Sequence, residues 1–152
     1  MLHDQGAHFY PVEMIAPNDA LAADNTPVEV DLQGYGAATI ILAVGVGGIT
    51  FSGTNKIEAK LTHGNTSGAL TAVARKDVEG IAAADLTDDE ISSGIIKSFI
   101  AEHAAAAIYV FRYVGGKRFI ELLADFSGTH GTGTPIYACC IRGRPNVSQL
   151  TV

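Results

Sequence analysis

The chain has 152 residues, a net charge of −6 at pH 7 and only 17% charged residues. This length fits one domain that can bury a core without a metal or disulfide staple. The acidic balance argues against wrapping nucleic acid, because neutralising phosphates requires clustered Lys and Arg. We expect no signal peptide, and no apolar run approaches the roughly 18 residues that a transmembrane helix needs.

The first 24 residues predict an N-terminal arm or an edge strand. Pro11 lies inside a strand-like run, and a proline there is tolerated mainly at the edge of a sheet. The turn signal Asn25-Thr26-Pro27 begins the expected domain, 25–145. The last residues, 146–152, are expected to form a C-terminal tail.

Alternation and turn composition predict several strands in the first half of the chain. Val28–Leu32 alternates and is typical of a half-buried strand, whereas Thr39–Val46 is continuously apolar, as in a strand covered on both faces. Lys56–His63 alternates again. The segment from His63 to Gly68 has the composition of a loop, and Leu70–Val73 predicts a short strand.

Residues 81–107 give mixed signals. Thr87 and Glu90 have the spacing of a capping box, which predicts the start of a helix of about two turns. Ile95–Ile100 predicts a strand. Ala101–Ala107 favours helix by propensity, but we expect a short helical turn at most, because the chain re-enters a sheet directly afterwards.

The clearest signals lie between residues 108 and 145. Three apolar or alternating runs, Ile108–Val114, Arg118–Phe126 and Ile136–Arg142, are separated by Gly-rich turns. They predict three antiparallel strands joined by hairpins, a meander. With the earlier segments, the sequence predicts an all-β fold: an antiparallel, jelly-roll-like β-sandwich of about eight strands with little helix.

No segment carries a recognisable catalytic, metal or cofactor motif, so we expect a non-enzymatic protein. The five histidines lack metal-ligand spacing and are expected on the surface or in loops. Cys139 and Cys140 are adjacent on a predicted strand, so we expect them to point to opposite faces as small buried hydrophobes. Glycine-rich Gly45–Gly48 and Gly128–Thr134 lack complete phosphate-binding motifs and indicate turns.

Half of the ten basic residues fall within 33 positions of the chain: Arg112, Lys117, Arg118, Arg142 and Arg144. One interpretation is ion pairing with Glu121 and Asp125 across neighbouring strands, worth roughly 0.2–1 kcal/mol per pair. The other is a docking surface for an acidic protein partner, because arginine is favoured at interfaces.

Five short motifs carry a resemblance to a known family: Asp31–Tyr35, Tyr113–Phe119, Ala124–Thr129, Gly133–Ile136 and Arg142–Pro145. As a set they resemble a family of small structural proteins of tailed bacteriophages, to which the head-spike base protein of gene transfer agents is similar. The resemblance covers roughly residues 28–145 and leaves out the N-terminal 24 residues.

The resemblance implies a virion protein on the outside of the capsid, assembled in the bacterial cytoplasm, that is a vertex-spike base or a decoration (cement) protein. Its implied partners are the major capsid protein, further copies of itself (a pentamer at vertices) and a spike fibre protein. It implies no cofactor, nucleic acid or membrane. The alternatives are a neck or tail component and a receptor- or glycan-binding module. For glycan binding the candidate aromatics are Tyr10, Tyr35, Tyr109, Tyr113 and Tyr137.

Overall fold

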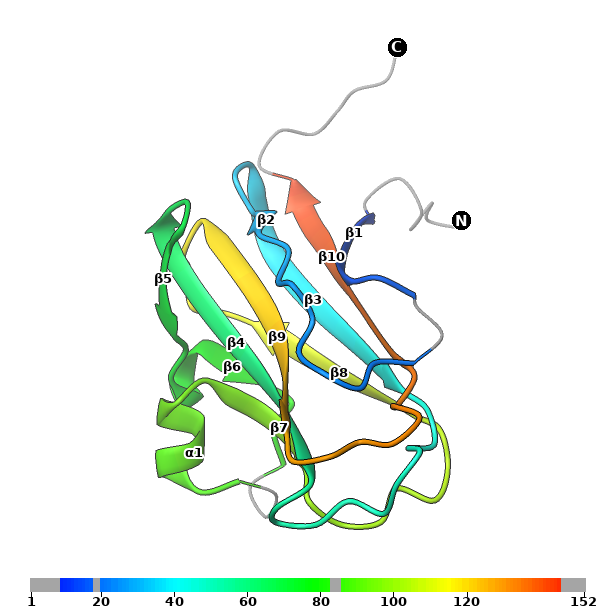
Figure 1. Cartoon of the computed structure of the whole chain (residues 1–152). Helices are drawn as coiled ribbons and strands as arrows, with labels where there is room; N and C mark the ends of the chain where they lie inside the picture. The colour runs from blue at the N-terminus through cyan, green and yellow to red at the C-terminus, as the bar shows by residue number, and fades with distance from the viewer. Residues whose placement is uncertain (1–8, 18–19, 83–85, 146–152) are drawn as a thin grey trace.

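The computed structural model describes residues 9–17, 20–82 and 86–145 and contains two antiparallel sheets packed face to face (Figure 1). Such packing buries one face of each sheet, which explains why most of the predicted strands alternate between apolar and polar residues. The expected tail, 146–152, and residues 1–8 and 18–19 of the expected arm lie outside the described residues. Residues 10–15 form a strand at one edge of the first sheet.

Most strands of the described part run along most of the length of a sheet, and a few are short. In chain order they are β1 (Tyr10–Ile15), β2 (Val30–Asp31), β3 (Tyr35–Val44), β4 (Lys56–Thr66), β5 (Ala69–Ala72), β6 (Val78–Glu79), β7 (Ile95–Phe99), β8 (Ala107–Tyr113), β9 (Phe119–Ser127) and β10 (Ile136–Pro145). A 3₁₀ turn, η2 (Arg75–Asp77), and a short helix, α1 (Asp88–Ser92), lie between β5 and β7 along the chain.

The strand order is that of a jelly roll. The first sheet runs β1-β10-β3-β8-β6, and the second runs β2-β9-β4-β5 with β7 also paired to β4. If the short β6 and β7 are set aside, the remaining strands numbered in sequence order give 1-8-3-6 in one sheet and 2-7-4-5 in the other. This is the double Greek key of a jelly roll, and it confirms the predicted β-sandwich with little helix.

The predicted meander is wrong, although its three strands exist. β8 and β10 lie in the first sheet with β3 between them, and β9 lies in the second sheet. The connection from Val114 to Arg118 therefore crosses from one sheet to the other and closes no hairpin. A glycine-rich turn permits both routes, and each strand instead pairs with partners that are distant in sequence.

β3 also differs from its prediction. Its even-numbered residues from Ala38 to Val44 are buried in the core, whereas Thr39, Ile41 and Ala43 on the other face are only half-buried. The continuous apolar run therefore does not mean cover on both faces. It means that the outward face of this strand is apolar too, which matters for the site described below.

Two smaller expectations need correction. β4 continues to Thr66, so residues 63–66 of the expected loop lie in a strand. Val28 is 42% exposed, because the ladder between β2 and β9 begins at Val30. The alanines before β8 form no helix, in agreement with the expectation of a short helical turn at most.

The predicted capping box is confirmed at the start of α1. Glu90 N–H donates to Thr87 Oγ1 (3.3 Å), and Thr87 N–H donates to Glu90 Oε2 (2.7 Å). The predicted strand after the helix is confirmed as β7. Among the described residues, no helix has the length and apolar character needed to cross a membrane.

Candidate functional site

Four of the five cations singled out from the sequence gather at one end of the sandwich. This end holds the β2–β3, β4–β5 and β8–β9 connections and the last residues of β10 (top of Figure 1). The four are Lys117, Arg118, Arg142 and Arg144. The fifth, Arg112, lies on the outer face of the first sheet, where its Nη1 is 3.1 Å from Glu79 Oε2.

Asp31 organises two of these arginines. Arg118 donates from Nε (2.9 Å) and Nη2 (2.7 Å) to the two carboxylate oxygens, and this pairing holds the pKa of Asp31 below its usual range. Arg142 Nη1 donates to the Asp31 carbonyl oxygen (3.1 Å), and its guanidinium lies 4.6 Å from the centre of the Tyr35 ring. Both arginines are therefore engaged within the fold.

The expected ion-pair partners are not the ones that the fold uses. Asp31 forms an ion pair with Arg118, and Glu79 forms one with Arg112. Asp125 pairs with Lys60 on β4. The side chains of Lys117 and Arg144 have no partner among the described residues, so they can meet acidic groups from outside. Arg144 also has a positive φ of 53°, an uncommon conformation for a residue other than glycine.

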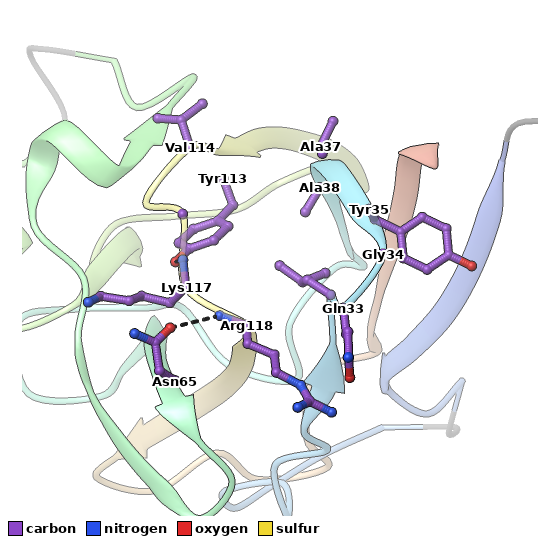
Figure 2. A pocket seen from close by; sticks show the side chains of 13 residues that line it. Gln33, Gly34, Tyr35, Ala37, Ala38, Asn65, Tyr113, Val114, Lys117 and Arg118 are labelled. Atoms are coloured by element: carbon purple, nitrogen blue, oxygen red, sulfur yellow. Dashed lines mark hydrogen bonds between the residues drawn. The ribbon is translucent and has the colours of Figure 1, made fainter. Parts of the chain in front are cut away.

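A pocket of about 420 Å³ opens between the two sheets at this end (Figure 2). Apolar atoms of Leu32, Ala38 and Tyr113 line it, and polar side chains such as Gln33 and Lys117 stand at its rim. Neither Asp nor Glu lines it, although the chain has 16 acidic residues. The pocket can accept an apolar group whose polar end meets amide or cationic side chains.

Beneath this pocket lies a buried polar cluster that the sequence did not indicate. His63 on β4 contacts Tyr113 on β8 through Nδ1 and the hydroxyl (2.8 Å), so the contact links the two sheets. Asp77 lies on the other side of the ring, 3.9 Å from Nε2. The members come from three separate segments, and no local pattern could have grouped them.

The protonation states in this cluster follow from the contacts. Lys117 N–H donates to the Tyr113 hydroxyl (3.0 Å), so that hydroxyl can give its own proton to an unprotonated His63 Nδ1. Burial lowers the pKa of His63; Asp77 opposes this shift, and Lys117 and Lys76 add to it. Burial also raises the pKa of Tyr113. Both shifts favour the uncharged forms of His63 and Tyr113, whose contact links the two sheets.

The expectation that the histidines lie on the surface or in loops fails for His63; His130 lies in a loop, as expected, but is buried. His63 is buried in β4, and His130 is buried against the Phe126 ring, with ring centres 4.8 Å apart. Neither belongs to a metal site: the described residues contain no group of three or more His, Cys, Asp or Glu side chains that could hold an ion.

Cys139 and Cys140 match their sequence prediction. Both are free and buried, and their side chains point to opposite faces of β10. Burial raises the pKa of the Cys140 thiol to about 12, so its reactive thiolate is not populated near neutral pH.

A second surface that the sequence did not single out is the outward face of the first sheet. Its central side chains are all uncharged: Thr39, Ile41, Ala43, Ile108, Val110, Tyr137, Cys139 and Ile141. We call this set the uncharged outer face. Ile108 is 69% exposed and Val110 is 52% exposed. The signal in the sequence was the continuous apolar run of β3, which we interpreted as cover on both faces.

The comparisons with known proteins found no matching family model, no similar curated protein and no similar solved structure.

Proposed function

We propose that this chain is a non-enzymatic structural protein on the outer surface of a tailed-phage or phage-like capsid, a vertex-spike base or decoration protein that binds the major capsid protein and further copies of itself. The observation that carries the proposal is the gathering of basic side chains at one end of an acidic sandwich. The sequence resemblance supports it. The jelly roll supports it by analogy, because viral capsid proteins use this architecture among others.

The basic end divides into supporting and available cations. Arg118 and Arg142 are held by Asp31, so they shape the end of the sandwich. Lys117 and Arg144 have no partner among the described residues. They can pair with carboxylates of a capsid protein without breaking an internal ion pair, which is the arrangement that electrostatic docking requires.

A matched pair of charge reversals on one strand tests this division. We expect Arg144→Glu to weaken co-sedimentation with capsid particles while thermal unfolding of the isolated protein is unchanged. We expect Arg142→Glu to lower the unfolding temperature. The substitution removes the contact of the guanidinium with Tyr35 and places a carboxylate next to the Asp31 carbonyl oxygen, where Arg142 donated a hydrogen bond.

The particles for this test are those purified from the cell that encodes the chain. The control is Arg75→Glu, since Arg75 pairs with Asp88 beside α1 rather than lying in the basic end. If Arg144→Glu binds particles like the parent protein, the basic end is not the docking surface. A particle reconstruction with no density for this chain on the capsid exterior contradicts the proposed location, and density at the neck or tail supports the alternative component.

A glycan-binding role has no support from the described aromatic residues. A sugar ring stacks on an open aromatic face, but Tyr35 is engaged by Arg142 and by Tyr10. Tyr109 is covered by Lys97 and Phe99, and Tyr113 is buried. Tyr137 is half-buried on the uncharged outer face.

A further inference from the structure

The side chains on the inward face of β3 become small at the basic end of the sandwich. Along the strand towards that end, the inward positions are Val44, Leu42, Ile40, Ala38 and Gly36. The first three fill the core with large side chains, whereas Ala38 contributes one methyl group and Gly36 contributes none. Ala38 and Gly36 both line the pocket of about 420 Å³ between the sheets. The pocket is therefore space at the end of the core that the side chains of β3 do not fill.

The backbone of Gly36 is open at the same place. Alternate residues of an antiparallel strand bond to opposite neighbours. Val114 N–H donates to the Asp77 carbonyl oxygen on the β6 side (2.8 Å), so Tyr113 directs its backbone groups to Ala38 on β3. Gly36, two residues from Ala38, directs its N–H and carbonyl oxygen the same way. The register between β3 and β8 ends before Gly36, and neither group is bonded within the described residues.

The polar groups at the mouth of the pocket favour an acidic occupant. Lys117 and Asn65 lie on one side of the mouth, and Gln33 lies on the other (Figure 2). Asn65 Oδ1 accepts a hydrogen bond from Arg118 N–H (3.3 Å), which leaves the Asn65 amide nitrogen as a donor. Arg118 is paired with Asp31, but the exposed Lys117 side chain has no ion pair within the described residues. Carboxylates beside the mouth would therefore meet an available cation and no lining carboxylate.

We propose that this pocket receives the tip of an acidic loop of a partner protein, with one apolar side chain between the sheets and neighbouring carboxylates against Lys117. The residue that carries the apolar side chain accepts a hydrogen bond from Gly36 N–H and donates one to the Gly36 carbonyl oxygen. Two residues bonded in this way point their side chains to the same face of a sheet, so this side chain points into the pocket. The inference rests on the proposed function, under which the partner is the capsid protein.

The short open stretch of β3 limits the occupant and its affinity. β8 occupies the position beside β3 as far as Tyr113, and β3 begins at Tyr35. One residue of an incoming chain can bond to Gly36, so the occupant is the tip of a loop and not a long added strand. A contact of this size gives an isolated peptide a Kd on the order of 100 µM, and many copies on a shell would raise the occupancy.

The test titrates the isolated full chain with the synthetic peptide acetyl-Asp-Thr-Leu-Thr-Asp-amide and follows backbone amide signals by NMR. We expect saturable shifts at Gly36, Gly116 and Lys117. N-methylation of the leucine nitrogen removes the bond to the Gly36 carbonyl oxygen and should weaken binding about tenfold. N-methylation of the following threonine is the matched control. Its N–H points away from β3 in an extended chain, so the Kd should change less than about twofold.

Variants of the chain test the pocket and the charge separately. Gly36→Leu fills the pocket and should abolish binding; Gly36 is not among the glycines with positive φ, so the strand can hold a leucine there. Lys117→Glu should weaken binding about tenfold. Its control is Lys76→Glu, because Lys76 is also an exposed lysine close enough to affect the pKa of His63 but does not line the pocket. Circular dichroism melting establishes that each variant is folded.

The outcomes separate this inference from the capsid assignment. No shifts at millimolar peptide, or equal binding of the two N-methylated peptides, would overturn the acidic loop. Tighter binding of decanoate than of the peptide would assign the pocket to a lipid instead. Peptide binding by a protein with no affinity for particles would support the acidic loop and contradict the capsid as its source. If Gly36→Leu binds particles like the parent while Arg144→Glu does not, the capsid assignment stands and the loop inference is wrong.

Discussion

Lys60 offers the sharpest test of the energetics of this fold. In the ladder between β4 and β9, Glu58 lies directly opposite Asp125, so two carboxylates meet across the strands. Lys60 lies between them: its Nζ pairs with Asp125 and is 3.6 Å from Glu58 Oε2. The hydrogen bond with Asp125 raises the pKa of Lys60. Lys60→Met removes the cation, keeps most of the side-chain volume and leaves the carboxylates facing each other.

The expected cost follows from partial burial. The exposed fractions are 29% for the Lys60 side chain, 9% for Glu58 and 25% for Asp125. Exposed ion pairs contribute ~0.2–1 kcal/mol, and breaking a buried pair costs ~3–5 kcal/mol. We therefore expect Lys60→Met to lower the free energy of unfolding by about 2 kcal/mol. For a chain of this length that corresponds to a fall of about 4–8 °C in Tm.

Urea unfolding at pH 7 measures this loss, and Lys56→Met is the matched control. Lys56 pairs with Glu58 but not with Asp125, and Glu58 keeps Lys60 when Lys56 is removed, so the control should lose less than about 1 kcal/mol. Adding Asp125→Asn to Lys60→Met should restore part of the stability by removing one of the facing charges. Equal losses in the two lysine variants, or no restoration, would refute the idea that Lys60 separates two carboxylates.

Two further predictions concern the buried cluster and the turns. Because burial lowers the pKa of His63 below its ordinary 6.5, the unfolded chain binds that proton more readily. Stability should therefore fall as pH drops below about 6.5, and His63→Leu should flatten this dependence in urea unfolding at pH 5 and 7.5. The groups facing His63 are Lys76, Asp77, Tyr113 and Lys117. Gly133→Ala should lower the free energy of unfolding by at least about 1 kcal/mol more than Gly34→Ala. Both glycines have φ near +85°, so the backbone strain is similar. A Cβ at Gly133 would lie 2.6 Å from the Leu21 carbonyl oxygen, whereas one at Gly34 meets nothing within 4 Å.

Alternation in the sequence predicted the strands and their buried faces, because that signal is local. In β9 the predicted face of Ile120, Leu122 and Ala124 is the one that packs into the core. Pairing could not be predicted in the same way. β1 pairs with β10 across more than a hundred residues, and a glycine-rich connection looks the same whether it closes a hairpin or crosses between sheets.

The candidate site was predictable only in part, for the same reason. The basic residues were found because they cluster along the chain. Their partner Asp31 was missed because it reaches Arg118 through the ladder between β2 and β9, which joins distant segments. The contact between His63 and Tyr113 was missed because it joins strands of different sheets, and no periodicity or motif spacing in the sequence relates the two residues.

The few charged residues of this chain are distributed unevenly between the outward faces of the two sheets. On the second sheet, charged side chains form ion pairs on the outward face, and the basic end carries Lys117 and Arg144. The uncharged outer face of the first sheet has none at its centre, and its residues Ile108 and Val110 stand exposed. The shortage of charge is therefore concentrated on the outward face of the first sheet, whereas the second sheet keeps charged side chains on its outward face.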